Sequence, residues 1–226
     1  MKTTSQDQLF DQLRALSFFQ PLAEGPLRWL CEHASWVEFT SGEVVFLEGE
    51  HVSGLHVVEQ GWLKIVKTSL DGREHVLRLI GPGEAFNESG VFANRPTPAT
   101  AIALEPAGIW LLRREAILHL LHEQPEFAQQ LIAGMAGRII DLVEAVADLS
   151  LRPVASRLAR LILQDSQDGV LPRPRWYTQS ELAARIGTVP DVVQRALRTL
   201  EIGGLIAIDR HQIRIRDRAA LEELAS

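Results

Sequence analysis

Cysteine is almost absent from this sequence of 226 residues, and the single one, Cys31, excludes an internal disulfide. The same count excludes a zinc or iron–sulfur site built mainly from cysteine. No stretch approaches the roughly 18 apolar residues that indicate a membrane span. The first residues, Met1 to Gln8, lack the apolar segment behind a basic start that marks a signal peptide. These absences predict a cytoplasmic protein.

Signatures of the common catalytic sites are missing as well. The sequence has no glycine-rich phosphate loop and no nucleophile elbow, and it has no internal repeats. Glu115, His119 and His122 share one helix face, but their apolar neighbours indicate the polar side of a short helix rather than a metal site. We therefore do not expect an enzyme.

Lysine is missing from the C-terminal third, where arginine carries all the positive charge. Residues 151–226 hold 12 Arg against 9 Asp and Glu, a net charge of +3. Residues 1–150 hold 11 Lys and Arg against 20 acids, a net charge of −9. A mildly basic C-terminal part suits an approach to phosphates, although a difference of this size also arises by chance.

The region from Val37 to Leu112 is typical of short strands separated by turns. Glu48-Gly49-Glu50 and Gly81-Pro82-Gly83 follow apolar stretches, and Asp71-Gly72 is a hairpin signal. Several short strands at near-regular spacing predict an antiparallel barrel or sandwich. The apolar face of Leu27 to Ala34 predicts a short helix before the first strand.

A long helix is predicted after Pro125, because apolar residues recur there at spacings of three and four. One interpretation is that the helix packs this seam on its own domain. Ile140 and Val143 widen the apolar surface beyond one stripe, however, which favours a second neighbour and hence a dimer. The predicted dimer seam consists of Leu131, Met135, Ile139, Leu142, Val146 and Leu149.

The most specific pattern lies in the C-terminal part. Thr178 and Glu181 have the spacing of a capping box, and Gly187 is expected to end this first helix in a left-handed conformation. Thr188 is expected to cap a second helix, with Pro190 in its first turn. Two short helices joined by a glycine turn form a helix-turn-helix, whose second helix enters the major groove of DNA.

A wing follows this helix pair. Leu205 to Ile208 and Gln212 to Ile215 are apolar stretches on either side of a polar tip that contains Arg210. Helix pairs without a DNA role are common, but helix, glycine turn, helix and basic wing in this order favour DNA binding. Arg195 can pair with guanine in the DNA-binding interpretation. The alternative is that Asp191 and Arg195, four positions apart on one helix, form only a surface ion pair. The predicted DNA contacts are Thr178, Gln179, Thr188, Asp191, Gln194, Arg195, Arg198 and Arg210.

These features together resemble the Crp/Fnr superfamily of bacterial transcription regulators over nearly the whole chain. The matching segments are Leu16 to Leu22, Ser41 to Glu50, Asp71 to Glu74, Gly81 to Glu84, the long helix, and residues 177–217. The resemblance implies an α+β chain, with an N-terminal antiparallel β-roll (a jelly-roll of the cyclic-nucleotide-binding type) in residues 1–124. A dimerisation helix in 125–152 and a winged helix-turn-helix in 153–226 would follow. It also implies a homodimer on a pseudo-palindromic DNA site, controlled by an effector, with RNA polymerase as a partner.

Departures from the family pattern concern the effector. In members that bind cyclic nucleotides, a Glu is followed by an Arg-Ser pair that holds the phosphate. Glu88 keeps the first position, but the pair falls on Thr97 and Pro98, which supply no cation. The positions that meet the purine fall on Leu142 and Val143, whose side chains form no hydrogen bonds. We therefore expect that cyclic AMP does not bind.

Other effectors stay open: an apolar molecule, a haem, a protein signal, or none. Because His51, His56 and His75 lie in or near the predicted roll, one of them can be an axial haem ligand, although such histidines are more often surface or turn residues. The iron–sulfur cluster of oxygen-sensing members is excluded by the cysteine count. The predicted effector pocket consists of Leu79, Phe86, Glu88, Val91, Thr97, Pro98, Ile139, Leu142 and Val143.

The recognition helix also departs from the family at one position. The frequent leading Arg falls on Pro190, while Asp191 and Arg195 match the acidic residue and the second Arg. The inner guanine contact should therefore persist and the outer base preference should differ. Two other hypotheses are a β-roll ligand-binding or cupin-like enzyme with a helical tail, and a dimeric scaffold whose DNA domain is vestigial.

Overall fold

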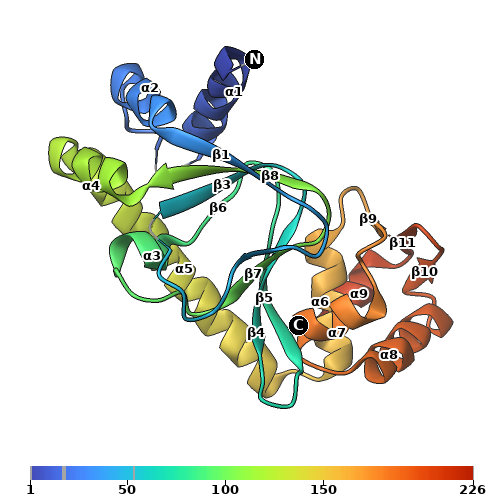
Figure 1. Ribbon diagram of the computed structural model, residues 1–226. Coiled ribbons are helices and arrows are strands. Elements are labelled where there is room, and N and C mark those ends of the chain that lie inside the picture. The colour runs from blue at the N-terminus through green and yellow to red at the C-terminus, as the bar shows by residue number, and fades with distance from the viewer. Residues whose placement is uncertain (1, 17–18, 53, 226) are drawn as a thin grey trace. The chain divides into compact units, whose positions relative to one another are not determined.

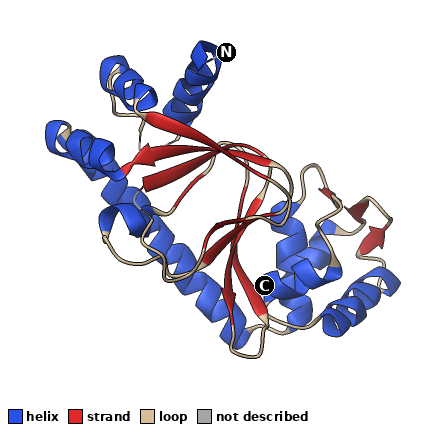
Figure 2. Ribbon diagram, viewed as in Figure 1, coloured by secondary structure: helices blue, strands red, loops and turns tan. Residues whose placement is uncertain are grey.

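The computed structural model describes residues 2–16, 19–52 and 54–225. These residues form two compact units. The first comprises Met1–Lys67 and Leu77–Ile140, and the second comprises Thr68–Val76 and Asp141–Ser226. Figures 1 and 2 show the helices and strands of both units.

Two four-stranded antiparallel sheets form a roll, whose strands belong to the first unit except where β4 and β5 run into the segment Thr68–Val76. One sheet has the order β1-β8-β3-β6 and the other has the order β2-β7-β4-β5. The strands are β1 (Ala34–Phe39), β2 (Val44–Phe46), β3 (Gly54–Gln60), β4 (Leu63–Thr68), β5 (Glu74–Ile80), β6 (Ala85–Phe86), β7 (Thr100–Ala103) and β8 (Ala107–Arg113). The predicted antiparallel β architecture is therefore confirmed.

The predicted Asp71-Gly72 hairpin joins β4 to β5. The N–H of Ser69 donates to the carbonyl of Arg73 at 2.9 Å, and the N–H of Gly72 donates back to Ser69 at 2.9 Å. Gly72 has a φ of 81°, a left-handed conformation that glycine adopts without the steric cost of a Cβ.

Helices pack on the β1-β8-β3-β6 sheet (Figure 1). They are α1 (Lys2–Ala15), α2 (Glu24–Glu32), α3 (Glu88–Phe92), α4 (Arg114–Glu123) and the first part of α5 (Pro125–Leu151). The helix predicted for Leu27 to Ala34 is wrong at its end. It stops at Glu32, and Ala34 begins β1, where it pairs with Leu112 of β8.

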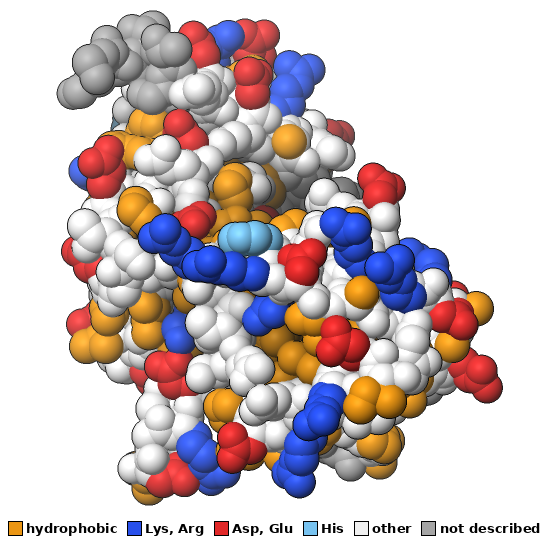
Figure 3. All heavy atoms as spheres, turned by 90° about the vertical axis from the view of Figure 1, so that its right-hand side faces the viewer, with side chains coloured by type: hydrophobic (Ala, Val, Ile, Leu, Met, Phe, Trp, Pro, Cys, Tyr) orange, Lys and Arg blue, Asp and Glu red, His pale blue; other side chains and the backbone are white. Residues whose placement is uncertain are grey.

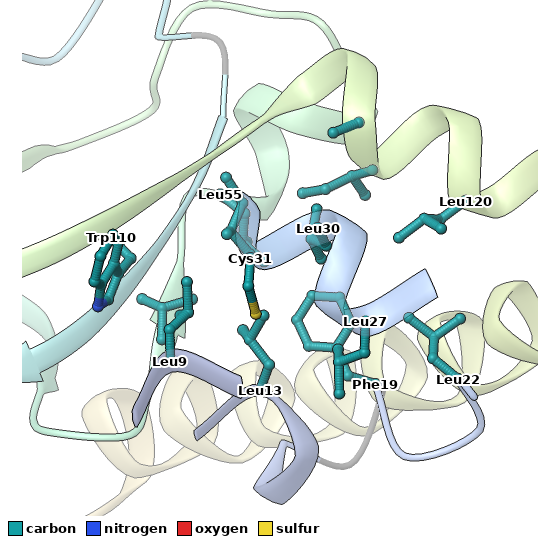
Figure 4. Packing of buried hydrophobic residues seen from close by; sticks show 14 of the residues in the cluster. Leu9, Leu13, Phe19, Leu22, Leu27, Leu30, Cys31, Leu55, Trp110 and Leu120 are labelled. Carbon is teal, nitrogen blue, oxygen red and sulfur yellow. The ribbon is translucent and has the colours of Figure 1, made fainter. Parts of the chain in front are cut away.

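Two apolar clusters lie on opposite sides of β3, because alternate side chains of a strand point to opposite faces. Leu55 and Val57 belong to the cluster beneath the helices, whereas Val58 belongs to the cluster inside the roll. Figure 4 shows the first cluster, in which side chains of α2 such as Leu30 and Cys31 meet those of α1 such as Leu13. The free thiol of Cys31 is buried there.

The second unit contains the helix-turn-helix. Its elements are α6 (Val154–Asp165), β9 (Val170–Pro172), α7 (Gln179–Ile186), α8 (Pro190–Ile202), β10 (Ile206–Ile208), β11 (Gln212–Ile215) and α9 (Arg218–Ala225). The wing has three strands in the order β10-β11-β9, because β9 adds to the predicted hairpin. Leu158, Ile162, Leu182, Val193 and Leu221 are fully buried and lie in one core that joins four of the helices.

The long helix after Pro125 is confirmed as α5 and runs through the division between the units. Within the described part of the chain, no helix combines the length and the apolar character that a membrane span requires.

Candidate nucleic-acid interface

The first helix of the helix-turn-helix begins as predicted. Thr178 is the N-cap of α7, and its hydroxyl accepts a hydrogen bond from the N–H of Glu181 at 3.2 Å. The N–H of Thr178 donates to the carbonyl of Trp176 at 2.8 Å, a bond that replaces the return half of a capping box. Thr178 is exposed and Gln179 is half-buried, so both remain at the surface at the start of α7.

The turn between the helices differs from the prediction in one residue. Gly187 ends α7 with a φ of 67°, as expected. The prediction that Thr188 caps the second helix is wrong. The N–H of Thr188 bonds back to Ala183 at 2.9 Å to complete the end of α7, and Val189 is the N-cap of α8, without a side-chain bond. Because Thr188 still belongs to the end of α7, the second helix begins one residue later than predicted, at Pro190.

The second helix, α8, has a buried and an exposed face, as a DNA-reading helix requires. Val193, Leu197 and Leu200 face the core. The polar face is exposed and contains the four predicted contacts Asp191, Gln194, Arg195 and Arg198. The Nε of Arg195 donates to the backbone carbonyl of Asp191 at 3.4 Å, a long bond that leaves most of the guanidinium donors available.

A partly buried ionic cluster holds the first helix of the motif to α6. Arg185 of α7 donates to Asp165 of α6 at 3.1 Å and to the hydroxyl of Tyr177 at 2.9 Å, and that hydroxyl donates to Asp165 at 3.0 Å. Burial by itself lowers the pKa of Arg185, but its bonds to Asp165 and the charge around it raise the pKa overall. Burial also raises the pKa of Tyr177, so the phenol stays protonated. Sequence reasoning missed this cluster, because its members come from three separate segments.

The wing tip is held in a defined conformation. Asp209 accepts hydrogen bonds from the N–H groups of His211 at 2.8 Å and of Gln212 at 2.9 Å. The bond from His211 contributes most to lowering the pKa of Asp209, and the bonds from Gln212 add to it, so the carboxylate stays ionised. Arg210 stands exposed between these residues, as the wing prediction requires.

The segment that would hold a cyclic phosphate is occupied by internal bonds. Thr97 is 2% exposed, and its hydroxyl donates to the carbonyl of Leu47 at 2.6 Å. Its N–H donates to Glu50 at 2.8 Å, and its carbonyl accepts from Gly49 at 2.9 Å. Pro98 is exposed and has no N–H to offer. The hydroxyl, N–H and carbonyl of Thr97 are thus all bonded to the turn at residues 47–50.

Inside the roll lies a histidine with apolar neighbours. The ring of His56 stacks on Phe86 with centroids 5.0 Å apart and meets Phe46 at 5.7 Å. Burial lowers the pKa of His56 to about 4, against an opposing effect of the Gly54 carbonyl, so the imidazole is neutral at pH 7. Its Nδ1 is buried, and no described residue forms a hydrogen bond with it.

The predicted effector-pocket residues of the roll do not all share one environment. Phe86 lies in the roll interior, but Val91 lies in the cluster beneath the helices, because it comes from α3. Leu79 and Glu88 are half-buried. Val91 therefore packs on the other side of β3 and does not line the roll interior.

Along α5, the predicted seam is exposed except at its start. Leu131 is 7% exposed, whereas Met135 and Ile139 are 40% and 62% exposed. Leu142, Val143 and Val146 are also exposed, while the side chain of Leu149 lies outside the described residues. In a single chain the large apolar side chains of Met135, Ile139, Leu142 and Val146 are thus exposed, whereas Leu131 is buried.

No cluster of three or more histidine, cysteine, aspartate or glutamate side chains suited to a metal ion occurs among the described residues. The winged helix-turn-helix with an exposed polar recognition helix is the arrangement of a DNA-binding protein.

Comparisons with known proteins agree with this class. Residues 36–124 match the cyclic nucleotide-binding domain family, and residues 156–224 match the Crp-like helix-turn-helix domain family. The cyclic AMP receptor protein of Thermus thermophilus is 30% identical over 83% of this chain and 86% of its own length. The CRP-like cAMP-activated global transcriptional regulator of Mycobacterium tuberculosis is 28% identical over 94% of this chain and 98% of its own. The structure of FixK2 from Bradyrhizobium japonicum, 21% identical, covers 85% of this chain and 98% of its own with a TM-score of 0.77.

The chain therefore belongs to the Crp/Fnr superfamily of bacterial transcription regulators. As a member of this family the chain is a DNA-binding transcription regulator and not an enzyme.

Proposed function

We propose that this regulator binds a pseudo-palindromic DNA site as a homodimer, reads base edges with Asp191, Gln194 and Arg195, and responds to an effector other than cyclic AMP. The observation that carries the DNA-reading part is the exposed polar face of α8, which is held on a buried core and follows a glycine turn. In this arrangement, side chains near the N-terminus of the second helix reach the major groove.

Arg195 is the residue on which the reading depends most. A guanidinium pairs with O6 and N7 of guanine, and each such pair discriminates against the wrong base by about 1–3 kcal/mol. Arg195→Ala should therefore lose affinity for the cognate site by about that amount per half-site, and should discriminate less at one base pair.

Arg198→Ala is the matched control on the same helix. Arg198 is proposed to contact phosphate, so its loss should weaken cognate and random DNA by a similar factor. Binding isotherms on sites recovered from the genome, against random duplexes, measure both. If Arg195→Ala binds the cognate site as tightly as the wild type, this assignment of the reading residue is wrong.

The dimer is supported by the uncovered apolar row on α5. Met135, Ile139, Leu142 and Val146 recur at spacings that two helices share in a coiled coil. Ile139→Glu should weaken the dimer strongly, because it places a charge in the seam. Sedimentation velocity measures the change, and Glu126→Gln, on the first turn of the same helix, serves as a control. A wild type that sediments as a monomer at all concentrations contradicts the dimer.

The exclusion of cyclic AMP is supported by the bonds of Thr97 and by Pro98, which together leave the phosphate position without a cation. Relatives named as cAMP-activated make cyclic AMP the first ligand to test. Calorimetry should detect no binding at micromolar concentrations. We propose that the effector is an apolar molecule or a haem, and a Soret band after haem supplementation separates these two.

A further inference from the structure

The positive charge of the second unit is not on its reading helix. Residues 190–202 carry two Arg and two acids, and residues 179–186 carry one of each, so both helices of the motif are neutral. The segments 169–178 and 209–216 together carry five Arg and a single acid, Asp209. Within a chain of net charge −6, the three-stranded wing is thus a local region of net charge +4.

The geometry brings these two segments together. Pro172 of β9 pairs with Gln212 of β11, and beyond the strand the N–H of Arg173 donates to the carbonyl of His211 at 2.7 Å. The guanidinium of Arg173 reaches across to the carbonyl of Asp209 at 3.4 Å. The segment after β9 therefore runs beside the wing tip.

The backbone of this segment has little freedom. Pro172 and Pro174 flank Arg173. Each proline has a fixed φ, and Pro174 also restricts Arg173 to extended conformations. The segment ends in a turn, where the N–H of Tyr177 donates to Pro174 at 2.9 Å and the Tyr177 ring is buried. Arg175 lies between these fixed points and is exposed.

We infer that Arg173, Arg175 and Arg210, here called the wing edge, bind the DNA phosphate backbone and supply most of the electrostatic affinity, while the neutral α8 supplies the sequence preference. Arg210 is one of the DNA contacts predicted from the sequence. Arg173 and Arg175 belong to the segment that follows β9, the strand that turns the wing hairpin into a sheet. The inference rests on the proposed function, since it assigns a second role within the same DNA interface. Figure 3 shows basic side chains in several groups with acidic ones among them, so this face is not uniformly basic and the wing edge is defined by its local geometry.

The salt dependence of binding tests the wing edge. Each phosphate contact contributes a slope of about −0.9 to the logarithm of the binding constant against the logarithm of the salt concentration. Fluorescence anisotropy of the full chain on a cognate and a random duplex, over a range of salt, gives both slopes. Arg175→Gln should reduce the steepness by about 1 per half-site, and Arg173→Gln/Arg175→Gln by about 2, on both duplexes.

Two variants keep the test decisive. Arg218→Gln removes the same charge from α9, where Arg218 pairs with Glu222 at 2.8 Å, and should leave the slope unchanged. Arg173→Lys/Arg175→Lys keeps the charge and should retain most of the slope, which a loss of folding would not allow. Slopes for the Gln variants equal to those of the wild type overturn the inference. So does a change confined to the cognate duplex, because it indicates base reading. If the wild type binds both duplexes equally, the proposed function fails instead, and the slopes still report on the wing edge.

Discussion

The two compact units treat their buried titratable groups in opposite ways. In the second unit, Arg185, Asp165 and Tyr177 are partly or wholly buried and bonded to one another. In the first, His56 sits between aromatic rings, and burial holds it in the neutral form. A charged cluster thus holds α7 to α6 in the second unit, whereas the titratable group described inside the roll is neutral.

This difference bears on the effector. The cluster inside the roll consists of apolar residues such as Phe46, Val58 and Ile109. An anionic ligand placed there would lose its hydration without gaining a cation. The neutral imidazole of His56 adds no positive charge with which an anion could pair. These features of the roll interior support the proposal that the effector is not cyclic AMP.

The largest expected effect comes from breaking the ionic cluster. Asp165→Ala leaves the largely buried Arg185 guanidinium without its carboxylate. Because the side chains of Arg185 and Asp165 keep 15% and 27% exposure, we expect a loss of about 3 kcal/mol of unfolding free energy, the lower end of the range for a buried pair. Urea denaturation, followed by circular dichroism, measures the loss.

The control for this prediction is an exposed ion pair in the same unit. Arg218 and Glu222 are both more than half exposed, so Glu222→Ala should cost at most about 0.5 kcal/mol. Equal effects of the two substitutions would mean that burial of the Asp165 cluster contributes nothing.

Sequence patterns located the helix-turn-helix well because its determinants are local. Thr178 and Gly187 act on the residues beside them, and the apolar spacing of α7 and α8 follows from helix geometry. The strand β9 was missed, since three residues ending in Pro172 form a strand only by pairing with β11, some 40 positions further on. The Asp165 cluster was missed for the same reason, because tertiary contact between distant segments creates it. The helix α9 gave no strong local signal, and its Leu221 is buried by the rest of the unit.

The second prediction concerns the roll and its neutral histidine. In the unfolded chain the pKa of His56 is near 6.5, and in the folded protein it is about 4, so the unfolded state binds the proton more readily. The stabilising contribution of the neutral form is therefore complete above about pH 6.5, decreases as the pH falls toward 4, and is lost below that value.

Between pH 7 and pH 5 the wild type should lose about 2 kcal/mol of unfolding free energy from this group, and His56→Phe should lack that share. Denaturation at both pH values measures it, with the exposed His119→Phe as the control. If His56→Phe and the wild type show the same pH dependence, His56 is not held neutral in the folded roll.

The smallest effect separates the two helix starts of the motif. Thr178 caps α7 through its hydroxyl, whereas α8 begins at Val189 without a side-chain cap. Thr178→Ala should therefore cost about 1 kcal/mol of unfolding free energy, the usual value for a lost N-cap bond. Thr188→Ala should cost less, because the bond of Thr188 to Ala183 uses the backbone N–H, which alanine keeps. Thermal denaturation of both variants compares the two sites. A larger loss at Thr188 would mean that its hydroxyl supports the turn, and would restore the assignment that the sequence pattern first favoured.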